Sequence, residues 1–150
     1  MLRITSRAAL ALLGLVVLSG CAANGEFNPV GQNSAEMTPP QLAAFAAKAQ
    51  YPADMQASND LRVAAIVSRD KETIEVYNFT DRPFSDAKVW VNKGFVAKVD
   101  GIAPMSKVTI ATSKLYGPFG NTFASQEKSV SSVQLETSNG LFNLMGPVQQ

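Results

Sequence analysis

Few side chains in this sequence are of the types that covalent or metal chemistry requires. The 150 residues include no histidine and a single cysteine, Cys21. Without histidine, the chain lacks the base of a Ser-His-Asp or Cys-His nucleophile system and any imidazole metal ligand. One cysteine makes neither an internal disulfide nor a cysteine-based zinc site. The chemistry of the lone thiol therefore depends on where Cys21 stands in the chain.

The carboxylates are the other groups that could act as acids, bases or ligands. They are spread over expected turns and polar strand positions, and no Asp-x-Asp-x-Asp calcium loop is present. Asp70 with Glu72, and Asp81 with Asp86, are close enough in sequence to hold a calcium ion in a loop. Both pairs are better interpreted as solvated turn residues. The 13 basic and 12 acidic side chains give a net charge of +1, which offers no basic field for nucleic acid. We therefore predict no catalytic residue, no metal site, no cofactor and no nucleic-acid partner.

The N-terminus has the order of a targeting segment. Arg3 and Arg7 form a short positive region, and an uncharged apolar run follows at 8–18. That run is shorter than the roughly 20 residues of a spanning helix, and its length suits the core of a signal peptide. It ends in Leu18-Ser19-Gly20-Cys21, which resembles the lipobox of bacterial lipoproteins.

The resemblance implies a diacylglycerol on the Cys21 thiol, cleavage before Cys21 and acylation of the new amino group. Two or three acyl chains hold a protein stably on a membrane, whereas one holds it only marginally. The implied partner is the membrane of a bacterial cell envelope. Ala22 in the following position resembles the outer-membrane sorting signal of many bacteria with two membranes. The alternative is an ordinary secretory signal that happens to precede a cysteine.

A tether and a short helix are expected next. The segment 22–37 is rich in Asn, Gly, Ser, Pro and Gln, which predicts a flexible tether. A Thr-x-x-Gln capping box at 38–41 predicts a helix over 39–50, ended by Tyr51-Pro52. We expect this helix to dock on the domain or lie loosely in the tether, because Lys48 alone gives too little positive charge for a membrane-surface helix. Its apolar stripe consists of Leu42, Phe45, Ala46 and Ala49.

From residue 61 onward the apolar pattern has period two, which predicts short strands separated by turns. The expected strands are Leu61–Ser68, Thr73–Phe79, Ala87–Asn92, Phe95–Val99, Lys107–Thr112, Ser131–Thr137 and Leu141–Met145. About seven strands at this spacing predict an all-β fold, an antiparallel β-sandwich of immunoglobulin-like or fibronectin-III-like type. The predicted organisation is a signal peptide at 1–20, a tether with the short helix at 21–58 and the sandwich domain at 59–147.

The hairpin around Lys93-Gly94 has a register that the sequence can decide. A three-residue loop at 92–94, with Gly94 left-handed, pairs Val91 with Phe95 and makes one face wholly apolar. Trp90 then lies on the opposite face, with Lys88 and Lys98 facing each other across the ladder.

Trp90 has three interpretations. It is covered by the helix or a loop, it belongs to the sandwich core in another register, or it forms a binding face with Lys88 and Lys98 for a sugar or a protein. The loop 113–124 has two interpretations. Its rings plug the open end of the sandwich, or Tyr116 and Phe119 belong to a recognition loop.

A wider resemblance concerns fold alone. Ile74-Glu75-Val76-Tyr77-Asn78, a polar turn, and Ala87-Lys88-Val89-Trp90-Val91-Asn92 resemble the opening strands of small immunoglobulin-like modules in bacterial envelope proteins. We expect a lipid-anchored envelope lipoprotein with a non-catalytic structural or protein-interaction domain. The alternatives are a module that binds carbohydrate or peptidoglycan and, least favoured, a carboxylate-based enzyme.

Overall fold

The structure is a computed structural model that describes residues 37–60, 62–126 and 129–144. The predicted signal peptide, the lipobox with Cys21 and most of the predicted tether lie outside the described residues. The end of the predicted domain, 145–147, lies outside them as well.

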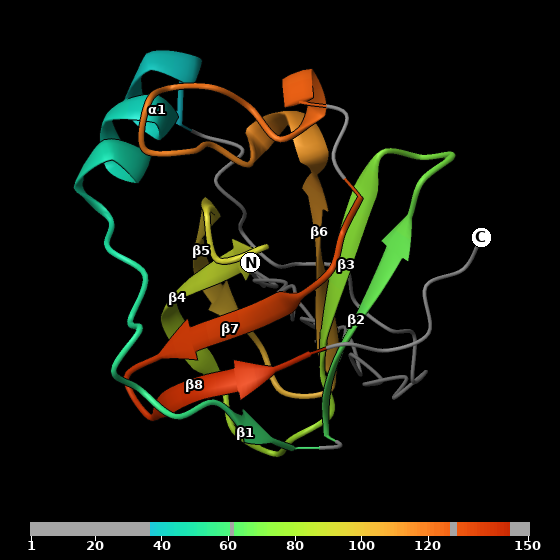
Figure 1. Ribbon diagram of the computed structural model, residues 1–150. Coiled ribbons are helices and arrows are strands. Elements are labelled where there is room, and N and C mark those ends of the chain that lie inside the picture. Colours follow the sequence, from blue (N-terminus) through green and yellow to red (C-terminus); the bar gives the residue numbers. More distant parts are fainter. Residues whose placement is uncertain (1–36, 61, 127–128, 145–150) are drawn as a thin grey trace, which may run out of the picture.

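Two β-sheets face each other, and all seven predicted strands are present (Figure 1). The smaller sheet has the order β2-β3-β6, and the larger has the order β1-β8-β7-β4-β5. A further strand, β1, pairs in parallel with β8 and was not predicted, because two residues are too few to show a period. The strands are β1 (Ser58–Asn59), β2 (Val63–Ser68), β3 (Thr73–Asn78), β4 (Phe84–Val91), β5 (Phe95–Ile102), β6 (Ser106–Ala111), β7 (Val133–Thr137) and β8 (Gly140–Asn143).

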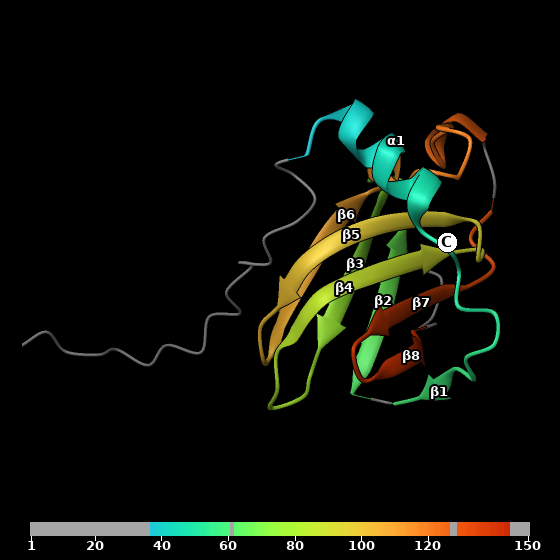
Figure 2. The same ribbon diagram turned by 90° about the vertical axis from the view of Figure 1, so that its left-hand side faces the viewer.

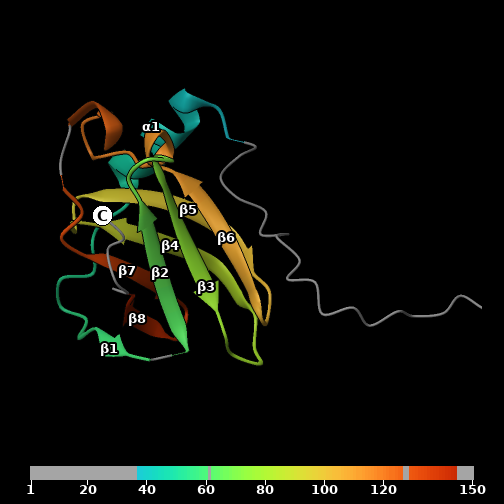
Figure 3. The same cartoon turned by 90° about the vertical axis from the view of Figure 1, so that its right-hand side faces the viewer.

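The period-two pattern decides which side chains lie between the sheets. In β2 and β3, buried residues alternate with partly exposed ones, so each strand turns one apolar row inward. Figure 2 shows the larger sheet in front, and Figure 3 shows the smaller sheet in front. The core lies between them. The core contains Val63, Ala65, Val67, Ile74, Val76, Val108 and Ile110 from the smaller sheet, and Val89, Val91, Val99 and Leu135 among others from the larger.

The register of the β4–β5 hairpin is confirmed, but its turn differs from the prediction. Val91 pairs with Phe95 and Trp90 with Val96. The left-handed residues are Asn92 and Lys93, with φ of 50° and 58°, and not Gly94. Two consecutive left-handed residues match the right-handed twist of a hairpin, and asparagine tolerates that conformation well. The Asn92 side chain is also held by the chain that leads into β7, since its Oδ1 accepts from the backbone N–H of Ser131 at 2.7 Å.

Helix α1 (Pro39–Lys48) is present and is two residues shorter than predicted. Its start is capped by Gln41, whose Oε1 accepts from the Thr38 backbone N–H at 2.8 Å. Leu42 and Ala46 are buried, so α1 is docked on the domain above β5 (Figure 2). Among the described residues, no helix has the length and apolar character needed to cross a bilayer.

The chain after α1 continues along the larger sheet. We call residues 37–59 the N-terminal belt. The Tyr51 hydroxyl donates to Gln134 Oε1 at 2.8 Å, and the Ser58 hydroxyl donates to the Leu141 carbonyl at 3.3 Å. The belt ends in β1 at the sheet edge. These residues, which the sequence placed in the tether segment, are therefore packed against strands from the far end of the chain.

A buried asparagine fastens the turn between β3 and β4. Asn78 is inaccessible to solvent, and its Nδ2 donates to the carbonyls of Arg82, Ile102 and Ala103 at 2.8–3.1 Å. Its Oδ1 accepts from the backbone N–H and the hydroxyl of Thr80. All of the amide's capacity is thus used inside the protein. Asn78-Phe79-Thr80 has the sequence of a glycosylation sequon, but in the folded chain the Asn78 amide is enclosed.

Candidate functional site

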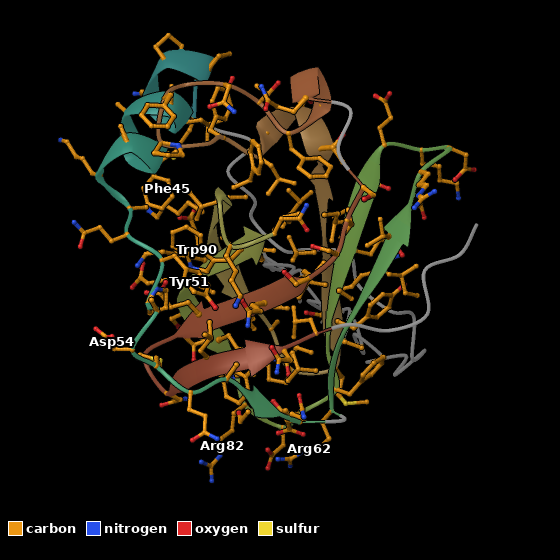
Figure 4. All side chains as sticks on the ribbon, in the orientation of Figure 1. Phe45, Tyr51, Asp54, Arg62, Arg82 and Trp90 are labelled. Atoms are coloured by element: carbon orange, nitrogen blue, oxygen red, sulfur yellow. The ribbon has the colours of Figure 1, made fainter. Side chains whose placement is uncertain are left out.

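Trp90, the first candidate for a binding face, lies under the N-terminal belt. It is 3% exposed, and the Tyr51 ring meets it edge-on with centroids 5.5 Å apart. Figure 4 shows Phe45, Trp90 and Tyr51 following one another from α1 down the side of the larger sheet. The interpretation in which the helix covers Trp90 is therefore the one that the structure shows, and an open aromatic face at Trp90 is not present. Its buried neighbours are Leu42, Ala46, Val96, Tyr116 and Leu141.

Glu136 explains how Trp90 and the two lysines are accommodated, and the sequence did not single it out. The Trp90 Nε1–H donates to Glu136 Oε2 at 2.7 Å, and the Lys88 ammonium donates to Oε1 at 2.6 Å. Lys88 and Lys98 face each other as predicted, but Lys98 has its own ion pair with Asp100 at 3.1 Å. The signal that could have revealed Glu136 is the pairing of β4 with β7, which places it opposite Lys88.

The loop between β6 and β7 separates its two candidate residues. Tyr116 is 8% exposed, and its backbone exchanges two hydrogen bonds with Val96 at the edge of β5. Phe123 is buried edge-on against Phe95. Phe123 closes the end of the two-sheet core, as the plug interpretation predicts, whereas Tyr116 packs in the Trp90 cluster under the belt. Phe119, in contrast, is 94% exposed.

Phe119 stands at the corner of a well-defined turn. The Gly120 N–H donates to the Gly117 carbonyl at 3.1 Å, and the Gly117 N–H donates to the Asn121 carbonyl at 2.8 Å. Pro118 occupies the first corner position, where its fixed φ is favourable. Gly120 has φ of +79°, which favours glycine. The backbone therefore holds Phe119 outward on a fixed support.

Two hollows of about 370 Å³ each lie at opposite ends of the domain. One is bordered by Val67, Arg69, Glu72, Phe123 and Val130, among others. The other contains Asp60, Arg62, Asp81 and Arg82, and Figure 4 shows Arg62 and Arg82 at the end away from α1.

One acid of the second hollow, Asp60, is engaged in a structural ion pair. Arg62 holds Asp60 in an ion pair at 3.0 Å, and its side-chain hydrogen bonds hold the pKa of Asp60 below the ordinary value. A carboxyl with a lowered pKa is a poor general acid. Within the described part of the chain, no group of three or more Asp, Glu, His or Cys side chains could hold a metal ion.

The exposed side of the smaller sheet carries a linked charged cluster. Lys107 Nζ donates to Glu75 Oε1 at 2.7 Å, and the Tyr77 hydroxyl donates to Glu75 Oε2 at 2.7 Å. The hydrogen bond from Lys107 is the main reason why the pKa of Glu75 is lowered. The hydrogen bond to Glu75 raises the pKa of Lys107, while burial raises the pKa of Tyr77.

This cluster predicts a pH dependence of stability. Because the pKa of Glu75 is lower in the folded state, its contribution is present above the ordinary value of about 4.3 and is lost as pH falls through the folded value. We expect Glu75→Gln to remove about 0.5–1 kcal/mol of stability at pH 7, the range of a surface ion pair, and less at pH 3. Urea unfolding at both pH values measures this. A deficit of the same size at pH 3 and pH 7 would contradict the assignment.

Comparison with known proteins gives no relative for this chain: no family model, no curated protein and no solved structure matches it.

Proposed function

We propose that this protein is a lipid-anchored lipoprotein of the bacterial cell envelope whose β-sandwich has a non-catalytic, structural or protein-interaction role. The observation that carries the proposal is the N-terminal order of positive charge, apolar run and lipobox ending in Cys21. Only 15 residues separate Cys21 from the belt, which begins at Met37 and is docked on the domain. Such a chain would hold the folded part close to the membrane. Ala22 supports the outer membrane as its location.

The finer fold that we propose is immunoglobulin-like, of fibronectin-III-like type. Counting from β2, the first, second and fifth strands form one sheet, and the third, fourth, sixth and seventh belong to the other. That division of seven strands is the one found in fibronectin-type III domains. The belt and β1 are additions to it.

Two features favour an interaction role over the alternatives. Four carboxylates of the described residues are engaged in ion pairs: Asp60, Glu75, Asp100 and Glu136. A carbohydrate or peptidoglycan module would use a flat row of exposed rings, and two of its three candidate rings, Trp90 and Tyr116, are buried. Envelope affinity capture with the lipidated protein would identify a protein partner.

The anchor is tested by Cys21→Ala. We expect the variant to remain unprocessed or to leave the membrane fraction, because one thiol receives the lipid on which both acylation and cleavage depend. Detergent phase partitioning and the mass of the N-terminal peptide measure this. The matched control is Ser19→Ala, which keeps a small residue in the lipobox and should leave both the partitioning and the mass of the mature lipopeptide unchanged. An unaltered membrane fraction for Cys21→Ala would refute the anchor.

A further inference from the structure

We propose that the end of the domain formed by Phe119 and the outward face of α1 rests on the lipid bilayer. This inference rests on the proposed lipid anchor. We call this surface the anchor-side end, and it comprises Pro118 and Phe119 at the loop tip with Pro39, Pro40, Ala44 and Ala47 on α1.

Phe119 is the first reason. It is the most exposed of the four large hydrophobic side chains that are exposed in the described structure, at 94% against 59% for Met105. Transfer of a phenylalanine side chain out of water is favourable, because it removes a large apolar area from solvent. The turn at Gly117–Gly120 holds the ring outward already, so little ordering is needed on contact.

The outward face of α1 is the second reason. A helix on a soluble domain usually turns charged residues to water. Here Pro39, Pro40, Ala44 and Ala47 are exposed, and the helix contains no acidic residue. Its one charged residue is Lys48, so the helix carries no negative charge that would repel the anionic headgroups of a bacterial membrane. The apolar stripe of α1 is used against the domain, so the helix supplies a weakly polar surface beside the loop and not an inserted helix.

The third reason is that the chain enters the domain at this end, since the link from Cys21 leads to Met37, directly before α1. A Cβ built on Gly120 would lie 4.0 Å from the Ala43 side chain, so the loop tip and α1 are neighbours. All three ribbon views place the loop and α1 at the same end of the domain (Figures 1–3). The link from Cys21 to Met37, with 15 residues between them, reaches at most about 58 Å when fully extended.

The anchor makes a weak contact sufficient. One phenylalanine would not hold a free protein on a bilayer. Once Cys21 is anchored, however, the short link to Met37 keeps Phe119 at a high effective concentration near the membrane, so its contact becomes an intramolecular event. The membrane that holds Cys21 is also the surface that this end meets first. We therefore assign lipid, and not a second protein, as the occupant.

The test places a probe on Phe119 in the full lipidated protein. Cys21 is the only cysteine, and its thiol is acylated in that protein, so Phe119→Cys provides a unique site for an environment-sensitive fluorophore. The protein is reconstituted in vesicles of phosphatidylethanolamine and phosphatidylglycerol. Met105→Cys is the matched control, because Met105 is exposed in the β5–β6 connection at the opposite end (Figure 2). Circular dichroism checks that both variants fold.

We expect a blue-shifted emission at position 119 and several-fold stronger quenching by nitroxides on the acyl chains than at position 105. Equal quenching at both positions would overturn the inference. A blue shift at 119 that appears only when envelope proteins are added, without lipid quenching, would overturn it in favour of a protein partner. The mass of the N-terminal lipopeptide is measured on the same sample. A lipidated protein with an unquenched probe refutes this inference alone, whereas an unlipidated chain refutes the proposed anchor.

Discussion

Replacing Trp90 by alanine is expected to lower the free energy of unfolding by about 3–5 kcal/mol, the range for removing a buried large aromatic side chain. The residue is 3% exposed and its ring joins the belt to the larger sheet, so its loss leaves a cavity between them. The substitution also removes the donor to Glu136 Oε2. Urea unfolding followed by far-UV circular dichroism measures the change, because Trp90 is the only tryptophan and its fluorescence is lost in the variant.

Trp90→Phe separates packing from hydrogen bonding. It keeps an aromatic ring in the cluster but loses the indole N–H, so we expect a loss of about 1–2 kcal/mol. Glu136 keeps Lys88 as a partner, which limits the effect. A Trp90→Ala protein within about 1 kcal/mol of the wild type would show that the belt contributes far less than its burial implies.

Replacing Asn78 by alanine is expected to destabilise the protein by about 3–5 kcal/mol, since five hydrogen bonds of about 1 kcal/mol each are lost in a buried site. The carbonyls of Arg82, Ile102 and Ala103 each lose the donor that Asn78 supplies, although Arg82 keeps the Thr80 hydroxyl as a donor. The Thr80 backbone N–H loses its acceptor. Asn143→Ala is the matched control. Its amide bonds Gln134 and Asn59 in a more exposed position, and we expect a much smaller loss. Similar losses for the two variants would contradict the role given to Asn78.

Asn78→Asp gives the sharper version of this test. It keeps the shape of the side chain but turns a carboxylate oxygen toward three carbonyls. Burial beside these acceptors should raise the pKa of the new carboxyl in the folded state. A raised folded pKa means that stability increases as pH falls. The deficit relative to wild type should therefore be smaller at pH 4 than at pH 7.

Much of the strand arrangement was predictable from the sequence, because burial on one face imposes alternation. The seven strands and the register of the β4–β5 hairpin followed from it, down to the pairing of Lys88 with Lys98. The helix followed from its capping box and its proline, although the sequence predicted its end at residue 50 and the structure ends it at Lys48. The left-handed turn residues did not, because Asn92 is held there by a chain segment nearly 40 residues away.

The candidate site was less predictable, since it depends on contacts between distant segments. The sequence shows Trp90, Tyr116 and Phe119 as three similar aromatic residues. Only the packing of the belt distinguishes the two that are buried from the one that is exposed. Likewise, Glu136 can bond Lys88 and Trp90 only because β7 pairs with β4. Asn78 finds its buried acceptors only because the β5–β6 connection lies against it.

The belt also determines when the fold can be completed. Tyr51 bonds Gln134 and Ser58 bonds Leu141, each across a sequence separation of 83 residues. In any chain that emerges N-terminus first, from a ribosome or through a translocation channel, the belt comes out before the strands that hold it. High contact order of this kind slows folding. The belt can therefore pack only after β7 and β8 have emerged. A chain whose C-terminal strands have not yet emerged cannot complete the larger sheet.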